Sequence, residues 1–195
     1  MSEAALWDKM RPHLAPLDPV RVENALGNGT PDVEYAGGWI ELKDGVSWPK
    51  KVEDPVRVHS LDRRPGQVAF LLRRWLAGGR CWVMTRVGRQ VFLHPGYEAK
   101  RLRDGLTTRQ FLTEAVWSSR ADGRVSATDA VRLRTILAGD VESMDCFTRA
   151  RHHRLTVRWT IEQAASAMSV EVDVLRSAEG RDLDAAQDVL DWWET

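Results

Sequence analysis

The chain has 195 residues, of which 43% are hydrophobic and 29% are charged, and its formal net charge is zero. This size fits one domain with a small addition, and this composition excludes a disordered chain. No apolar run approaches the ~20 residues of a membrane span and no secretory signal pattern is present, so we expect a cytoplasmic protein without a membrane partner.

The first predicted elements are a helix over 3–11, limited by Pro12, and a second helical stretch near 19–26. The letters NGTP at 28–31 indicate a turn. Next, DVEYA and WIELK flank Gly37 and Gly38, which predicts a β-hairpin that ends at Lys43.

A polar loop over 44–62 follows the hairpin, and long loops of this kind often carry function. Apolar residues at helical spacing predict a helix over 67–77, which Gly78 and Gly79 end. Two strands are expected over 80–94, and Cys81 lies in the first of them. Residues 1–117 are therefore predicted to form a small α/β domain.

Strand patterns are absent after a predicted linker at 118–127, so we expect a small all-helical domain over 128–195. Its first helix is predicted over 128–140 with Thr128 as the N-cap, and further helices over 142–154 and 160–178. Residues 160–179 resemble a helix-turn-helix. A plain helical pair remains the alternative, because Glu171 and Asp173 would repel phosphates.

The hairpin carries the residues with the clearest chemical meaning. Glu41 and Lys43 share one face of their strand, and Asp32 begins the partner strand. Two neighbouring carboxylates need a cation, and Mg²⁺ or Mn²⁺ prefers such oxygen ligands. These residues could form a metal site that hydrolyses a phosphodiester. The alternative is a surface ion-pair cluster.

The segment TPDVEYAGGWIELK resembles the PD-(D/E)XK signature of restriction-endonuclease-like nucleases, with Pro31 and Asp32 in the first half and Glu41, Leu42 and Lys43 in the second. Arg64 and Gln67 resemble the Arg-x-x-Gln element of the VRR-NUC group. The resemblance covers about residues 3–94. It implies a restriction-endonuclease-like core of helix, β-hairpin, helix and strands, together with DNA cleavage that depends on a divalent metal.

Roles follow from the resemblance residue by residue. Asp32, Glu41 and the backbone carbonyl of Leu42 would hold the metal. Glu23 would be a first-helix ligand, Lys43 would position the attacking water, and Gln67 would orient Lys43 or a phosphate. Five basic residues would contact DNA: Lys50, Lys51, Arg57, Arg63 and Arg64.

The sequence therefore predicts a Mg²⁺- or Mn²⁺-dependent DNA endonuclease, similar to phage and mobile-element enzymes. The VRR-NUC resemblance implies branched or flapped DNA as the substrate. One active site cuts one strand, so symmetric double-strand cleavage would need a homodimer. The alternative function is a non-enzymatic regulator that binds DNA through the helix-turn-helix and keeps an inactive nuclease-like scaffold.

Overall fold

The computed structural model describes residues 2–22, 29–51, 53–62 and 66–139, together with the single residues Glu162 and Asp173. The chain divides into two compact units, residues 1–139 and 140–195. All elements named below belong to the first unit. The predicted helices over 142–154 and 160–178 lie almost entirely outside the described residues, as do Glu23, Arg63 and Arg64.

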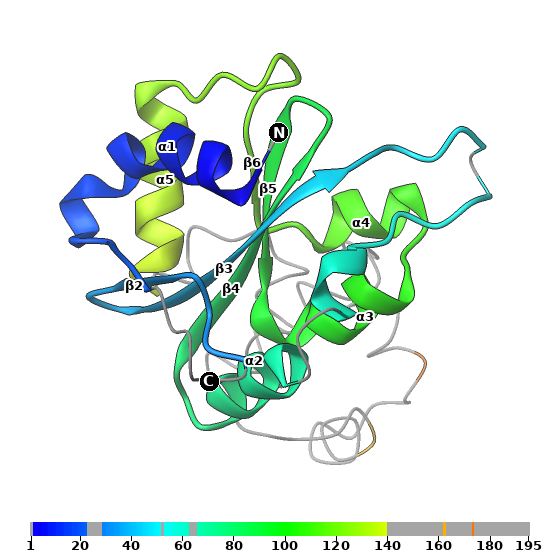
Figure 1. The fold of residues 1–195 in the computed structure, drawn as a ribbon, viewed down its shortest axis with the longest axis horizontal. Coiled ribbons are helices and arrows are strands. Elements are labelled where there is room, and N and C mark those ends of the chain that lie inside the picture. The colour runs from blue at the N-terminus through cyan, green and yellow to red at the C-terminus, as the bar shows by residue number, and fades with distance from the viewer. Residues whose placement is uncertain are drawn as a thin grey trace. The chain divides into compact units, whose positions relative to one another are not determined.

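The first unit is a mixed α/β fold built on one six-stranded sheet with the order β1-β2-β3-β4-β5-β6 (Figure 1). β3 and β4 are parallel, and every other neighbouring pair is antiparallel. A parallel pair needs a crossover, which the helix between these two strands supplies. The strands are β1 (Val20–Arg21), β2 (Val33–Tyr35), β3 (Gly38–Val46), β4 (Arg80–Val87), β5 (Gln90–Pro95) and β6 (Trp117–Ser118).

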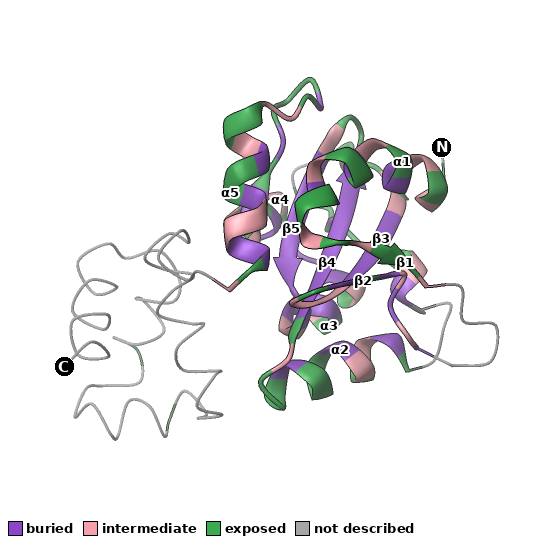
Figure 2. Ribbon diagram, turned by 90° about the vertical axis from the view of Figure 1, so that its left-hand side faces the viewer, coloured by how far each residue is buried: buried purple, intermediate pink, exposed green. Residues whose placement is uncertain are grey.

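Helices cover both faces of the sheet: α1 and α5 lie on one side, and α2, α3 and α4 lie on the other (Figures 1 and 2). The α-helices are α1 (Glu3–Leu14), α2 (Gln67–Leu76), α3 (Ala99–Asp104), α4 (Thr108–Glu114) and α5 (Ala127–Leu137). Three short 3₁₀ helices are η1 (Ala15–Leu17), η2 (His59–Asp62) and η3 (Gly96–Glu98).

The central strand β4 is buried on both faces, and its residues 81–84 form a continuous apolar run that is followed by the buried polar residues Thr85 and Arg86. Cys81, Val83 and Val87 face the apolar cluster formed with α2, α3 and α4. Trp82 points to the opposite face, where its indole Nε1 donates to the Tyr35 hydroxyl at 2.9 Å. Tyr35 in turn donates to the Leu137 carbonyl at 2.9 Å, which ties α5 to the hairpin.

Helix α5 belongs to the first unit, although the sequence pattern assigned it to the helical part after 128. Trp117 Nε1 donates to the Asp129 carbonyl at 2.9 Å, and Arg134 Nη1 donates to the His13 carbonyl at 3.0 Å. Leu133, Ile136 and Leu137 of this helix are fully buried. The boundary between the units therefore falls after Gly139 and not at 118–127.

Three local predictions were wrong. Helix α1 runs through Pro12 to Leu14, because the buried contacts of its apolar face outweigh the one hydrogen bond that Pro12 cannot donate. Val20 and Arg21 form strand β1, which pairs with β2, where a helix was expected. The N-cap of α5 is Ser126 and not Thr128, because Ser126 and Asp129 form a reciprocal capping box.

His94 gives the fold a testable pH dependence. The residue is fully buried on β5, and its Nε2 lies 2.9 Å from the Phe111 carbonyl oxygen. Burial lowers the pKa of His94 from 6.5 to about 4. The unfolded chain therefore takes up this proton at a higher pH than the folded chain, so the contribution of His94 to stability is lost as the pH falls from about 6.5 towards 4.

We expect the stability advantage of the wild type over His94→Gln to shrink by about 2 kcal/mol between pH 7 and pH 5. The variant keeps an amide that can donate to the Phe111 carbonyl but cannot become cationic. Urea unfolding of both proteins at each pH measures this difference, and comparing the two proteins cancels every other titrating group. Parallel stability curves would contradict the assignment.

Candidate active site

Strand β3 brings Glu41 and Lys43 together on one buried face of the sheet. Glu41 is 0% exposed and Lys43 is 3% exposed. The Lys43 ammonium forms an ion pair with Glu41 Oε1, and it lies 3.2 Å from Oε1 of Glu3 at the start of α1. The predicted pair of an acid and a base is therefore adjacent in space and removed from solvent.

Asp32 lies at the open edge of β3. β2 begins at Val33, which lies opposite Ile40, so the described residues supply no strand partner on that side for the part of β3 after Ile40. The carboxylate takes the place of a strand, because Leu42 N donates to Asp32 Oδ2 at 2.9 Å. In a β-strand the N–H and C=O of one residue point to the same edge, so the Leu42 carbonyl also faces the side of Asp32.

The electrostatics of this group favour a bound cation. Burial raises the pKa of Glu41 to about 8, with Lys43 lowering it and the nearby Asp32 raising it. Burial opposes the charged form of Lys43, but Glu41, Glu3 and Asp32 together raise the pKa of the ammonium. The single positive charge of Lys43 does not fully compensate the negative charge of the carboxyl groups around it. A further cation would compensate the remaining charge.

The donor set fits a hard divalent cation. Glu41 Oε2 is buried and has no hydrogen-bond partner among the described residues. Asp32 uses one oxygen for Leu42 and keeps a second one, and the residue is only partly buried. No group of three His, Cys, Asp or Glu side chains that could hold a metal is found in the described ranges. Two carboxylates with a backbone carbonyl suit Mg²⁺, which keeps several of its waters.

Gln67 begins α2 on the helix face that also buries Leu71 and Trp75. It is 0% exposed, and neither amide atom has a hydrogen-bond partner in the described part of the chain. The chain just before Asp32 lies against this helix start: a Cβ on Gly29 would come within 2.7 Å of the Gly66 backbone carbon. The structure therefore places the first turn of α2 beside the segment that leads to Asp32.

Glu3 is a site residue that sequence analysis missed. Its side chain is 35% exposed and contacts Lys43 from the first turn of α1, where Ser2 is the N-cap. The resemblance had suggested Glu23 as the first-helix acid, and that residue lies outside the described ranges. The available signal was an acid in the first turn of the predicted helix 3–11, but no local pattern indicates which strand that turn meets.

The end of β3 beyond Lys43 is held by a buried ion pair with β4. Arg86 Nε lies 2.7 Å from Asp44 Oδ1, and Arg86 Nη2 lies 2.5 Å from Asp44 Oδ2. Bidentate pairs of this kind fix both partners in orientation as well as in distance. The register between the two strands shifts between Lys43 and Val46. The ion pair therefore anchors β3 next to Lys43, at the point where regular pairing ends.

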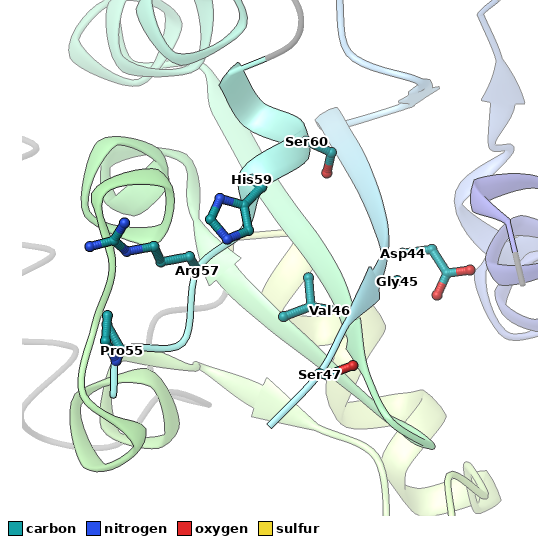
Figure 3. Close-up of a pocket in the computed structure, with 8 residues that line it drawn as sticks. All are labelled: Asp44, Gly45, Val46, Ser47, Pro55, Arg57, His59 and Ser60. Atoms are coloured by element: carbon teal, nitrogen blue, oxygen red, sulfur yellow. The ribbon is translucent and has the colours of Figure 1, made fainter. Parts of the chain in front are cut away.

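A pocket of about 540 Å³ follows on from the site, between residues 44–47 and the segment 55–60 (Figure 3). The guanidinium of Arg57 points away from β3. Lys50, Lys51 and Arg57 are exposed, as DNA contacts would require. Arg63 and Arg64 lie outside the described residues, so this structure bears on three of the five predicted basic contacts.

No protein-family model and no curated protein matches this chain. Among the described residues, no helix is long and apolar enough to cross a membrane.

Proposed function

We propose that this protein is a divalent-cation-dependent endonuclease that hydrolyses DNA phosphodiester bonds on a restriction-endonuclease-like core. The observation that carries the proposal is the fully buried Glu41 paired with Lys43, with Asp32 at the open strand edge beside it. The first unit has the element order helix, hairpin, helix and strand pair, which supports a restriction-endonuclease-like core.

Burial argues against a surface ion-pair cluster as the role of these residues. An exposed pair contributes little to stability, and a buried pair has a desolvation cost that can exceed its Coulomb attraction. Apolar residues of similar size would often serve a fold as well or better. We therefore infer that Glu41 and Lys43 are retained for chemistry.

Asp32, Glu41 and the Leu42 carbonyl would hold Mg²⁺ or Mn²⁺. When bound, the cation lowers the pKa of a coordinated water and offsets charge on a phosphoryl oxygen. Lys43 would orient that water and stabilise negative charge that develops on the phosphate. Glu3 would keep the ammonium in place from the side of α1, and Gln67 would present its amide to Lys43 or to the phosphate.

The substrate is proposed to be DNA, with Lys50, Lys51 and Arg57 contacting its backbone. Contacts to phosphates position a strand without reading its sequence, so we expect cleavage selected by DNA structure more than by sequence. Branched or flapped DNA is the form that the resemblance implies. Symmetric cutting of both strands would need two copies of the chain.

Removal of metal tests the proposal directly. We expect the protein to nick supercoiled plasmid with Mg²⁺ or Mn²⁺, and to bind DNA without efficient cutting in Ca²⁺. Excess EDTA should abolish the nicking, because Asp32 and Glu41 supply hard oxygen ligands for the metal. Undiminished cleavage in EDTA would rule out this mechanism. DNA binding without cutting in any of these metals would instead support the regulator with an inactive scaffold.

A further inference from the structure

We propose that the Thr85 hydroxyl is a positioning group for Lys43, a role that rests on the proposed function. Thr85 lies on β4 directly opposite Lys43 in the parallel pairing of β3 and β4. Partners in this register place their side chains on the same face of the sheet. The Lys43 ammonium and the Thr85 hydroxyl are therefore neighbours across one strand gap.

The Thr85 hydroxyl is buried and has no hydrogen-bond partner in the described part of the chain. The residue is 0% exposed. Its other strand neighbour is Phe92, which cannot accept or donate a conventional hydrogen bond. Valine has the same shape and would avoid the cost of a buried unpaired hydroxyl. A polar group kept at such a cost is expected where it serves function.

Lys43 supplies the partner once a cation binds. Its ammonium has three donor hydrogens, and two acceptors contact it here, the carboxylates of Glu41 and Glu3. A cation on Glu41 Oε2 would draw charge from the carboxylate and so weaken its attraction for the Lys43 ammonium at Oε1. The ammonium would then turn from Glu41 towards β4, where Thr85 Oγ1 is an unused acceptor on the same face. The hydrogen bond to Thr85 would then fix the position of the Lys43 ammonium, so that the ammonium can orient the attacking water.

Two substitutions separate this role from a packing role. Thr85→Val removes the hydroxyl and keeps the branched shape. Thr85→Ser keeps the hydroxyl and removes a buried methyl group. The control is Thr135→Val on α5, which lies on the opposite side of the sheet and removes a hydroxyl that bonds to the Val131 carbonyl. Each protein would be measured for melting temperature in EDTA and in Ca²⁺, and for kcat and KM with Mg²⁺ on nicked-plasmid formation.

We expect Thr85→Val to be more stable than wild type in EDTA but slower in cleavage, and Thr85→Ser to be less stable but nearly as fast as wild type. Thr85→Val should melt a few degrees higher than wild type in EDTA, by about 2–4 °C, and this gain should disappear in Ca²⁺. Its kcat should fall about tenfold while KM stays unchanged, since one transition-state positioning contact is lost. Thr85→Ser should melt at a lower temperature than wild type, because it loses a buried methyl group. Both Thr85→Ser and the control Thr135→Val should keep a kcat within about threefold of wild type.

Failure of this inference is distinct from failure of the proposed function. If the wild type cuts with Mg²⁺ but Thr85→Val keeps the wild-type kcat, or gains stability equally in EDTA and Ca²⁺, then the hydroxyl has no link to Lys43 and the nuclease proposal stands. If the wild type never cuts, the nuclease proposal fails, and a cation-independent stability gain in Thr85→Val would overturn the Thr85 role as well. If Thr85→Val does not fold, a normal rate in Thr85→Ser supports the role, and a rate loss that matches its stability loss contradicts it.

Discussion

Glu41→Gln is expected to lower the rate of DNA cleavage by on the order of 10²-fold or more, together with a clear loss of metal affinity. Glu41 is fully buried, and its Oε2 has no partner among the described residues, so it is the group best placed to accept a cation. Glutamine keeps the shape of the side chain, but its amide is neutral and offers one oxygen in place of two. Titration calorimetry with Mn²⁺ beside a nicking assay measures both losses.

The folded state of Glu41→Gln should remain intact in EDTA. Burial already disfavours the charged form of Glu41 and raises its pKa, and the amide oxygen of glutamine can still accept a hydrogen bond from the Lys43 ammonium. The matched control is Glu34→Gln, which alters an exposed carboxylate on the neighbouring strand β2. Wild-type metal affinity in Glu41→Gln would remove this residue from the metal site.

Lys43→Met is expected to lower cleavage by a similar factor, on the order of 10²-fold or more, while metal still binds. Methionine fills nearly the same buried space but carries no charge. Asp32 and Glu41 remain, and without a nearby ammonium their affinity for a cation should hold or rise. The rate falls because the water is no longer oriented and charge on the phosphate is not compensated.

The separation of metal binding from rate distinguishes Lys43 from Glu41. Lys100→Met on α3 is the control, because it removes an exposed lysine that pairs only with Asp104 in the described structure. Cleavage by Lys43→Met near the wild-type rate would refute the assigned site, and the hairpin would then be a structural element without catalytic residues.

The elements with strong local signals could be predicted from sequence. Glycines mark the turn of the β2–β3 hairpin and the end of α2, and the apolar pattern of α2 matches its buried face. The two strands over 80–94 were also predicted, because their sequence has strand-type apolar residues on both sides of a turn at Val87 and Gly88. Within the site, the alternation of side chains along a strand was enough to place Glu41 and Lys43 on one face.

Other features depend on contacts between distant segments and have no local signal. The sequence pattern shows that 128–140 forms a helix, but only the bonds from Tyr35 and Trp117 show that this helix packs on the first unit. Glu3 meets Lys43 across 40 positions of the chain. The role of Asp32 as a hydrogen-bond acceptor for Leu42 arises because β2 begins only at Val33, which no residue pattern of β3 itself predicts.

The shortness of β2, which pairs with β3 only as far as Ile40, has a consequence for how copies of this protein can associate. A strand with unpaired N–H groups is a template for a strand from another molecule, and such pairing leads to aggregation. At Leu42 the Asp32 carboxylate already occupies the N–H, so an incoming strand would have to displace a charged group and bring its own backbone beside it. The acid proposed to bind metal thus also protects the sheet, and dimers that form in solution should use a surface other than this edge.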